Sequence, residues 1–207
     1  MLLYGNFFFR ESFLRLPFFM LIFVEIYLSL FMEKELKIID QLKTELTATS
    51  EQQLLKTLEK VKGKGNDQMI EPILNLYSST THDSVKEGIK GLLNELKVVD
   101  GTNILIERLN NCNNELKEVI LGGLWSAGLN PIEYLPEIVQ VACSSTYMVA
   151  FEALTVLENL EGPFDEEKIS ESKLIINDYF AEPNEDTKQL ISVILGLLNE
   201  MDNSLDA

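Results

Sequence analysis

Residues 83–93 read DSVKEGIKGLL, and this stretch indicates how the rest of the chain folds. An acidic residue that can cap a helix comes first, and Val85, Ile89 and Leu92 then follow at intervals of three or four residues. This is the spacing of one side of an α-helix, in which about 3.6 residues complete a turn. The stretch therefore predicts a helix that buries one side against its neighbours.

The same pattern returns at a fixed distance along the chain. Three sets of residues share intervals of 31, 31 and 40, namely the helix-start residues Asp83, Asn114, Ser145 and Glu185, the positions Val85, Leu116, Tyr147 and Thr187, and the positions Ile89, Ile120, Phe151 and Ile191. In the preceding helices Ile73, Ile104 and Leu135 are also 31 residues apart. Such self-similarity is typical of repeated units that bury their apolar sides against each other. An ordinary bundle of similar helices is the alternative, but the joint recurrence of start, apolar and lysine positions favours repeats.

Helical spacing of apolar residues continues through the chain from Glu33, and strand-like alternation is almost absent. The first helix of this body carries the stripe Leu36, Ile39, Leu42 and Leu46. The second begins after Thr49-Ser50 and stops at the Gly63-Lys64-Gly65-Asn66 run. Eight further helices are predicted over residues 67–78, 84–97, 103–111, 115–127, 132–143, 146–160, 166–180 and 185–201. We predict an all-α fold, an α-solenoid of about five stacked antiparallel helix pairs that occupies residues 32–207.

The stretch Asp83–Leu93 resembles the second helix of HEAT-like repeats, in particular the short form with about thirty residues per unit. Leu116-Lys117 with Ile120 and Leu124, and Thr187-Lys188 with Ile191 and Leu195, are similar to the same pattern, whereas Tyr147-Met148 departs from it. The resemblance covers about Asp67 to Met201, with a degenerate pair at Glu33–Lys62. It implies an architecture and not a chemistry, since most proteins of this type are scaffolds or adaptors and a few are enzymes.

Residues 1–31 have a different composition, because eight of the eleven phenylalanines lie there. The nearly continuous apolar run Leu16–Phe31 predicts an apolar helical segment, and it is a poor membrane span because it is short and contains Glu25. No small residues that would suit a signal-peptide cleavage site follow it. Three interpretations remain: a membrane anchor, a buried helix, or translated sequence upstream of a true start at Met32. The third is favoured because Met32 directly precedes the acidic start of an amphipathic helix.

The net charge of −16 is unevenly distributed. From Asn130 to Ala207 there are 3 basic and 16 acidic residues, whereas Glu33–Leu129 carries 12 basic and 15 acidic residues. Nucleic-acid binding depends on basic side chains that displace counterions from phosphates, so direct binding of DNA or RNA is not expected. The acid indicates either a solvated surface or a basic partner.

Few residues are available for chemistry. His82 is the only histidine and is expected in a turn, and the two cysteines, Cys112 and Cys143, are one repeat apart. A disulfide or a metal held by these thiols is conceivable, but small, partly buried residues at helix ends are the favoured interpretation. Gly63-Lys64-Gly65 lacks the other residues of a phosphate-binding loop. We therefore predict no catalytic, metal-binding or cofactor-binding residues.

Glycines recur inside the expected helices, at Gly88, Gly91, Gly122, Gly123 and Gly196. Each costs up to about 1 kcal/mol relative to alanine. We expect them where two helix backbones approach closely.

The predicted function is a non-enzymatic protein-interaction scaffold of HEAT-like type in the cytoplasm. The partner is expected to be a protein or peptide, possibly basic, and the candidate contact residues are Lys86, Lys90, Lys117 and Trp125. The lysines belong to the second helices, which line the inner face of HEAT-like arrays, and Trp125 is either an aromatic anchor or a core residue. The alternatives are a membrane-tethered module that retains residues 16–31, and an enzyme or enzyme-assisting subunit of HEAT-like type.

Overall fold

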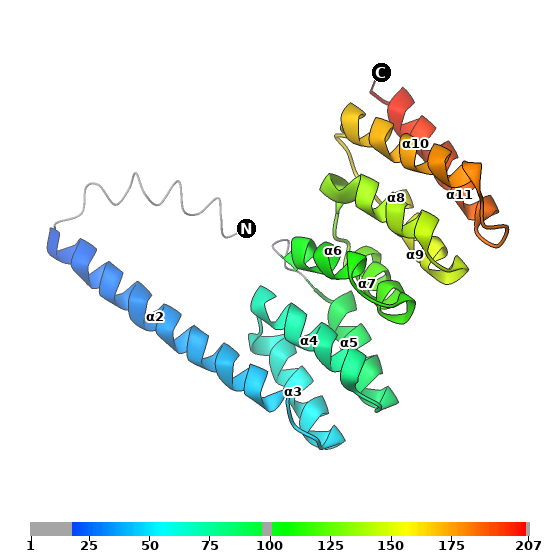
Figure 1. Cartoon of the computed structure of the whole chain (residues 1–207). Coiled ribbons are helices and arrows are strands. Elements are labelled where there is room, and N and C mark those ends of the chain that lie inside the picture. Colours follow the sequence, from blue (N-terminus) through cyan, green and yellow to red (C-terminus); the bar gives the residue numbers. More distant parts are fainter. Residues whose placement is uncertain (1–17, 97–100, 206–207) are drawn as a thin grey trace.

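The structure, a computed structural model, describes residues 18–96 and 101–205. These residues form ten α-helices and two short 3-10 turns and contain no β-strand, so the predicted all-α class is confirmed (Figure 1). The α-helices are α2 (Phe18–Glu45), α3 (Glu51–Lys64), α4 (Ile70–Ser79), α5 (Asp83–Asn94), α6 (Thr102–Asn110), α7 (Asn114–Ser126), α8 (Leu135–Ser144), α9 (Tyr147–Glu158), α10 (Glu166–Ala181) and α11 (Lys188–Asn203). The 3-10 turns η1 (Asp67–Met69) and η3 (Ile132–Tyr134) lead into α4 and α8.

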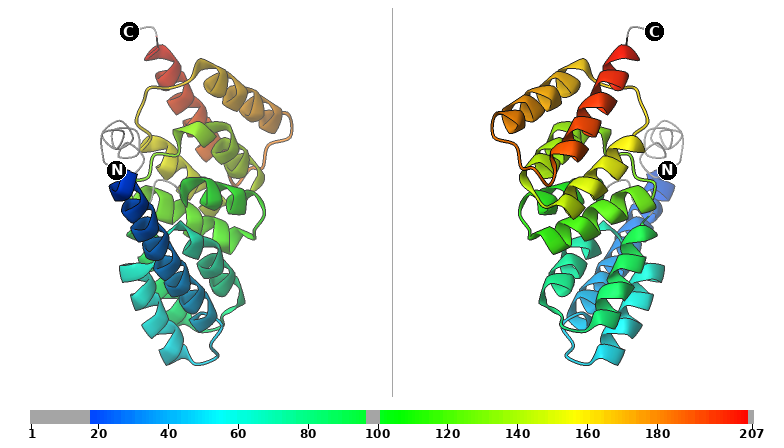
Figure 2. Two further views of the ribbon diagram at one scale, coloured as in Figure 1. Left: turned by 90° about the vertical axis from the view of Figure 1, so that its left-hand side faces the viewer. Right: turned by 90° about the vertical axis from the view of Figure 1, so that its right-hand side faces the viewer.

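The helices pack in two layers that follow the order of the chain. The helices α3, α5, α7, α9 and α11 contact one another in succession, and α4, α6, α8 and α10 do the same. Each helix of the second set also packs on its successor in the chain, so that α4 contacts α5 and α10 contacts α11. Figures 1 and 2 show these pairs following one another toward the C-terminus, a packing that suggests stacked helix pairs.

Local signals in the sequence set several helix ends. The side chain of Asn113 accepts a hydrogen bond from the amide of Leu116 at 3.0 Å, and Asp165 accepts one from Glu167 at 2.8 Å. Both side chains satisfy amides that have no partner in the first turn of their helix. Helix α3 ends where the glycine run predicts, and a Cβ on Gly65 would stand 2.6 Å from the carbonyl oxygen of Val61.

The core lies between the two layers and is one continuous cluster of buried apolar side chains. Three polar residues, Thr57, Ser172 and Thr187, are buried with them. Each makes a hydrogen bond, for example from Ser172 Oγ to the carbonyl of Lys168 at 2.7 Å. A buried hydroxyl that keeps a partner avoids most of its desolvation cost.

Burial corrects the predicted register of the repeats. Val85, Leu116 and Val149 are the buried equivalents near the starts of α5, α7 and α9, at intervals of 31 and 33 residues. Tyr147 and Phe151, predicted to fill such positions, are exposed. In the first layer the matching buried residues Ile73, Leu105 and Leu135 lie 32 and 30 residues apart, and Ile104 is only half-buried. The repeat is therefore near 31 residues on average but varies by one or two from unit to unit.

Helix α2 joins the apolar N-terminal segment to the body without a break. It begins at Phe18 and runs through Met32, so the helix start predicted at Glu33 is wrong. Ile39, Leu42 and Leu46 are buried, whereas Leu36 is 49% exposed. Figure 1 shows the N-terminal half of α2 standing away from the other helices. Among the described residues, no helix combines the length and the apolar character that crossing a membrane requires. Leu16 and Pro17 of the apolar run lie outside these residues.

The loops after α7 and α9 are joined by two hydrogen bonds. The side-chain amide of Asn130 donates to the carbonyl of Glu161 at 2.7 Å, and its oxygen accepts from the amide of Glu161 at 3.3 Å. These residues are 31 positions apart, so the bonds fix one helix pair against the next at its loop end.

Candidate binding face

The exposed side of α3, α5, α7 and α9 carries two hollows. Every charged or aromatic residue proposed from the sequence belongs to α5 or α7, so this side holds the candidate site. We call it the binding face and define it by the residues that line the two hollows together with the exposed apolar residues of α9.

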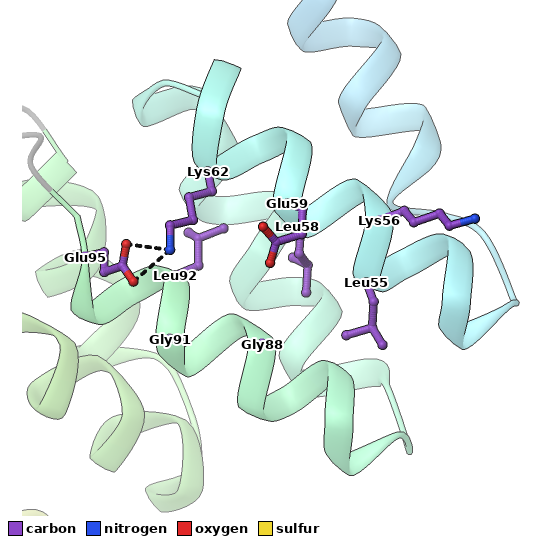
Figure 3. A pocket seen from close by; sticks show the side chains of 9 residues that line it. All are labelled: Leu55, Lys56, Leu58, Glu59, Lys62, Gly88, Gly91, Leu92 and Glu95. Atoms are coloured by element: carbon purple, nitrogen blue, oxygen red, sulfur yellow. Dashed lines mark hydrogen bonds and ion pairs between the residues drawn. The ribbon is translucent and has the colours of Figure 1, made fainter.

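The first hollow lies between α3 and α5 and has a volume of about 470 Å³ (Figure 3). Leu55, Leu58 and Leu92 supply its apolar surface, and Gly88 and Gly91 leave space along α5. At one end Lys62 pairs with Glu95 at 2.6 Å, an interaction that raises the pKa of Lys62 through its hydrogen bond. The charged residues around this hollow, Lys56, Glu59, Lys62 and Glu95, balance in sign.

The second hollow lies over α5, α7 and α9 and has a volume of about 380 Å³. Its charged lining consists of one lysine and three carboxylates, Lys90, Glu115, Glu118 and Glu152. Trp125 closes one side, and its indole Nε1–H donates a hydrogen bond to Oε2 of Glu152 at 2.9 Å. Gly122 contributes no side chain, so the hollow stays open between α7 and α9.

A linked set of polar contacts borders the second hollow on the α5 side. Lys86 Nζ lies 2.7 Å from Oε1 of Glu115 and 5.1 Å from the centre of the Tyr77 ring. The hydroxyl of Tyr77 donates to the same carboxylate at 3.2 Å. The pKa of Glu115 is lowered mainly by the Lys86 hydrogen bond, and burial together with Glu115 raises the pKa of Tyr77 to about 12.

Glu118 has the opposite environment. Burial raises its pKa, and the neighbouring carboxylates Glu152 and Glu115 raise it further. Within residues 18–96 and 101–205 neither Glu118 nor Glu152 takes part in an ion pair, because Lys86 pairs with Glu115 and Lys90 pairs with Glu87 at 2.7 Å. The second hollow therefore holds concentrated negative charge that the protein leaves uncompensated.

The structure brings three of the four predicted contact residues together. Lys90 and Trp125 line the second hollow, and Lys86 reaches its edge through Glu115. Lys117 lies apart from the hollow and donates a hydrogen bond from Nζ to Ser145 Oγ at 3.0 Å. The lysines do not project freely into solvent as expected, since Lys86 and Lys90 are both held by carboxylates.

Sequence reasoning missed the exposed apolar residues of α9. Tyr147, Met148 and Phe151 are each close to half exposed, and Val193 on the adjacent α11 is 47% exposed. Tyr147 and Phe151, and Met148 and Glu152, are four residues apart and share sides of the helix. The departure of Tyr147-Met148 from the repeat pattern was the signal that could have identified them.

The glycine prediction holds at two of five positions. A Cβ on Gly88 would stand 3.1 Å from Leu58, and one on Gly123 would stand 3.1 Å from Leu93, so helices do approach closely there. At Gly91 and Gly196 a Cβ would meet nothing within 4 Å, and at Gly122 only Oε2 of Glu152 at 3.7 Å. The prediction of close approach is wrong for these three.

The residues considered for chemistry lie apart from one another. His82 is half-buried at the start of α5, with Nδ1 3.7 Å from a carboxylate oxygen of Glu51. Cys112 and Cys143 are free, half-buried thiols whose pKa values are raised by burial, that of Cys143 to about 11. No group of three or more metal-ligating side chains occurs in the part of the chain that the structure describes.

Comparison with known proteins gives the chain no relative, since no family model, curated protein or solved structure matches it.

Proposed function

We propose that this chain is a non-enzymatic interaction scaffold of HEAT-like type, in which stacked helix pairs form an α-solenoid and a protein segment binds across the second helices. The observation that supports it most is the exposed side of α7 and α9. Trp125, Met148 and Phe151 are 40–49% exposed there, beside an open hollow of about 380 Å³. Aromatic and methionine side chains are enriched where proteins bind each other.

The repeat architecture supports the proposal because it makes this side continuous. The second helices pack on one another from α3 to α11, and both hollows open on the same side of that layer. A ligand that spans several units can combine many weak contacts along such a surface.

The test is capture of partners from cells by the full chain and by two matched variants. Phe151→Glu places a charge in the apolar part of the binding face. Leu174→Glu does the same on α10 of the other layer, where Leu174 is 64% exposed. A partner that is retained by the wild type and by Leu174→Glu but lost from Phe151→Glu supports the proposal. If the two variants retain the same proteins, the proposed face is wrong.

A membrane-tethered form of the same scaffold is the second candidate, and the exposed apolar end of α2 favours it. Ile26, Tyr27, Leu28, Leu30, Phe31 and Met32 are all about half exposed or more. An apolar patch of this kind commonly marks a contact with another surface. Flotation of the full chain with lipid vesicles, compared with a Leu28→Glu/Phe31→Glu variant, tests the tether. Equal flotation of the two proteins would count against it.

A further inference from the structure

The exposed part of the binding face on α7 and α9 combines apolar and acidic groups in a fixed arrangement. Met148 and Phe151 on α9 are adjacent in spacing to Glu152, and Glu152 accepts the indole hydrogen bond of Trp125 on α7. Apolar contact area and negative charge therefore adjoin on two helices that pack directly on each other.

The charge in the second hollow is not neutralised by the chain itself. Lys86 and Lys90 lie nearby, but each is paired with a carboxylate other than Glu118 and Glu152. The electrostatic repulsion at Glu118, seen in its raised pKa, comes in part from Glu152 and Glu115. A cation placed in the hollow would relieve that repulsion, whereas an anion would increase it.

We propose, on the basis of the function proposed above, that the occupant of this face is a protein segment that carries a lysine or arginine flanked by apolar residues. The cationic group lies in the second hollow beside Glu118 and Glu152, and the apolar residues lie on Met148 and Phe151. Trp125 suits this occupant, because an aromatic ring face attracts cations while its apolar area packs against side chains.

The choice of occupant follows from charge complementarity. A nucleic acid or an anionic membrane would meet uncompensated carboxylates in the hollow, on a chain whose net charge is −16. A basic segment gains attraction from the hollow and from the whole chain, while the apolar residues restrict which basic segments fit.

The test is selection of peptides from a displayed random library against the immobilised full chain. Selected peptides are then measured in solution by the fluorescence of Trp125, which is the only tryptophan of the chain and lines the hollow. Two double variants of equal charge change provide the comparison. Glu118→Gln/Glu152→Gln alters the hollow and still allows the Trp125 hydrogen bond, whereas Glu171→Gln/Asp178→Asn removes two exposed carboxylates from α10. Circular dichroism verifies that both remain folded.

We expect the selected peptides to carry a net positive charge together with apolar residues. Their affinity should fall about tenfold for Glu118→Gln/Glu152→Gln and less than about twofold for Glu171→Gln/Asp178→Asn. An equal loss in both variants would mean that the acidic surface attracts cations generally, which overturns the inference. Selection of neutral or acidic peptides that no longer bind Phe151→Glu would overturn the inference but leave the proposed function intact. Recovery of no peptide sensitive to Phe151→Glu would contradict the proposed function itself.

Discussion

A Cβ atom added to Gly123 of α7 would stand 3.1 Å from Cβ of Leu93 on α5 and 3.7 Å from its carbonyl carbon. The absence of a side chain at Gly123 thus lets the two helices approach, and Leu93 is fully buried at the contact. Gly91 on α5 is different, because a Cβ there would meet no atom within 4 Å.

These two glycines predict opposite effects of the same substitution. Gly91→Ala should raise the free energy of unfolding by about 0.5 to 1 kcal/mol, because alanine restricts the unfolded chain and favours the helix. Gly123→Ala gains the same helix preference but forces α7 away from Leu93, and we expect a net loss of about 1 kcal/mol. Urea denaturation of both variants, with unchanged dependence on urea concentration, measures the difference.

Gly91→Ala also separates stability from binding. The methyl group would enter the hollow between α3 and α5, so a partner that uses this hollow should bind the more stable variant less tightly. If Gly123→Ala proved as stable as Gly91→Ala, the close contact with Leu93 would not hold α7 in place.

Glu118 and Glu115 lie one turn apart on α7 and should respond oppositely to loss of charge. Burial and neighbouring carboxylates raise the pKa of Glu118, so its ionised form destabilises the folded state at neutral pH. Glu118→Gln should therefore raise the free energy of unfolding at pH 7, by less than about 1 kcal/mol because the site is partly solvated. Glu115→Gln should lower it, since the Lys86 hydrogen bond holds the pKa of Glu115 below its ordinary value.

The pH dependence checks the assignment of these effects. The advantage of Glu118→Gln should disappear as the pH falls below the ordinary glutamate value of 4.5, where Glu118 itself becomes protonated. The deficit of Glu115→Gln should persist to a lower pH, because Glu115 stays ionised there. A gain from Glu118→Gln that is the same at pH 7 and pH 4 would have a cause other than charge.

The sequence was sufficient to predict the helices and their order, because apolar spacing and turn residues are local properties. The glycine run after α3 and the acidic start of α10 mark helix ends through the backbone groups next to them. The register of α9 was not predictable in this way. A change of two residues in one repeat moves Val149 and not Tyr147 to the buried position, and self-similarity at 31 residues does not show that change.

The candidate site was predictable in position but not in character. Spacing placed Lys90 and Trp125 on second helices, and both line the second hollow. Their charge partners could not be read from spacing, because Lys86 pairs with Glu115, which is 29 residues away. Contacts between units thus convert an expected basic surface into an acidic one.

Tyr77 should resist ionisation in the folded protein. Its side chain is buried, its hydroxyl donates to Glu115, and its pKa is raised to about 12. The unfolded chain would ionise this tyrosine near pH 10, so the free energy of unfolding should fall as the pH rises from about 10 toward 12. Tyr77→Phe should remove this part of the decline and cost about 0.5 to 1.5 kcal/mol at pH 7 through the lost hydrogen bond. Equal alkaline slopes for the two proteins would contradict the burial of Tyr77.

Cys143 should react more slowly than Cys112 with a thiol reagent at pH 8. The attacking species is the thiolate, and burial raises the pKa of Cys143 to about 11, so roughly one thiol in a thousand is ionised. Burial also raises the pKa of Cys112, but Lys117 and Arg108 partly offset that rise. Mass spectrometry of alkylated peptides after timed exposure to iodoacetamide measures both rates. In urea the two thiols should become equally reactive, because the difference belongs to the packing of α8 against its neighbours. Rapid modification of Cys143 in the folded chain would show that this packing opens readily.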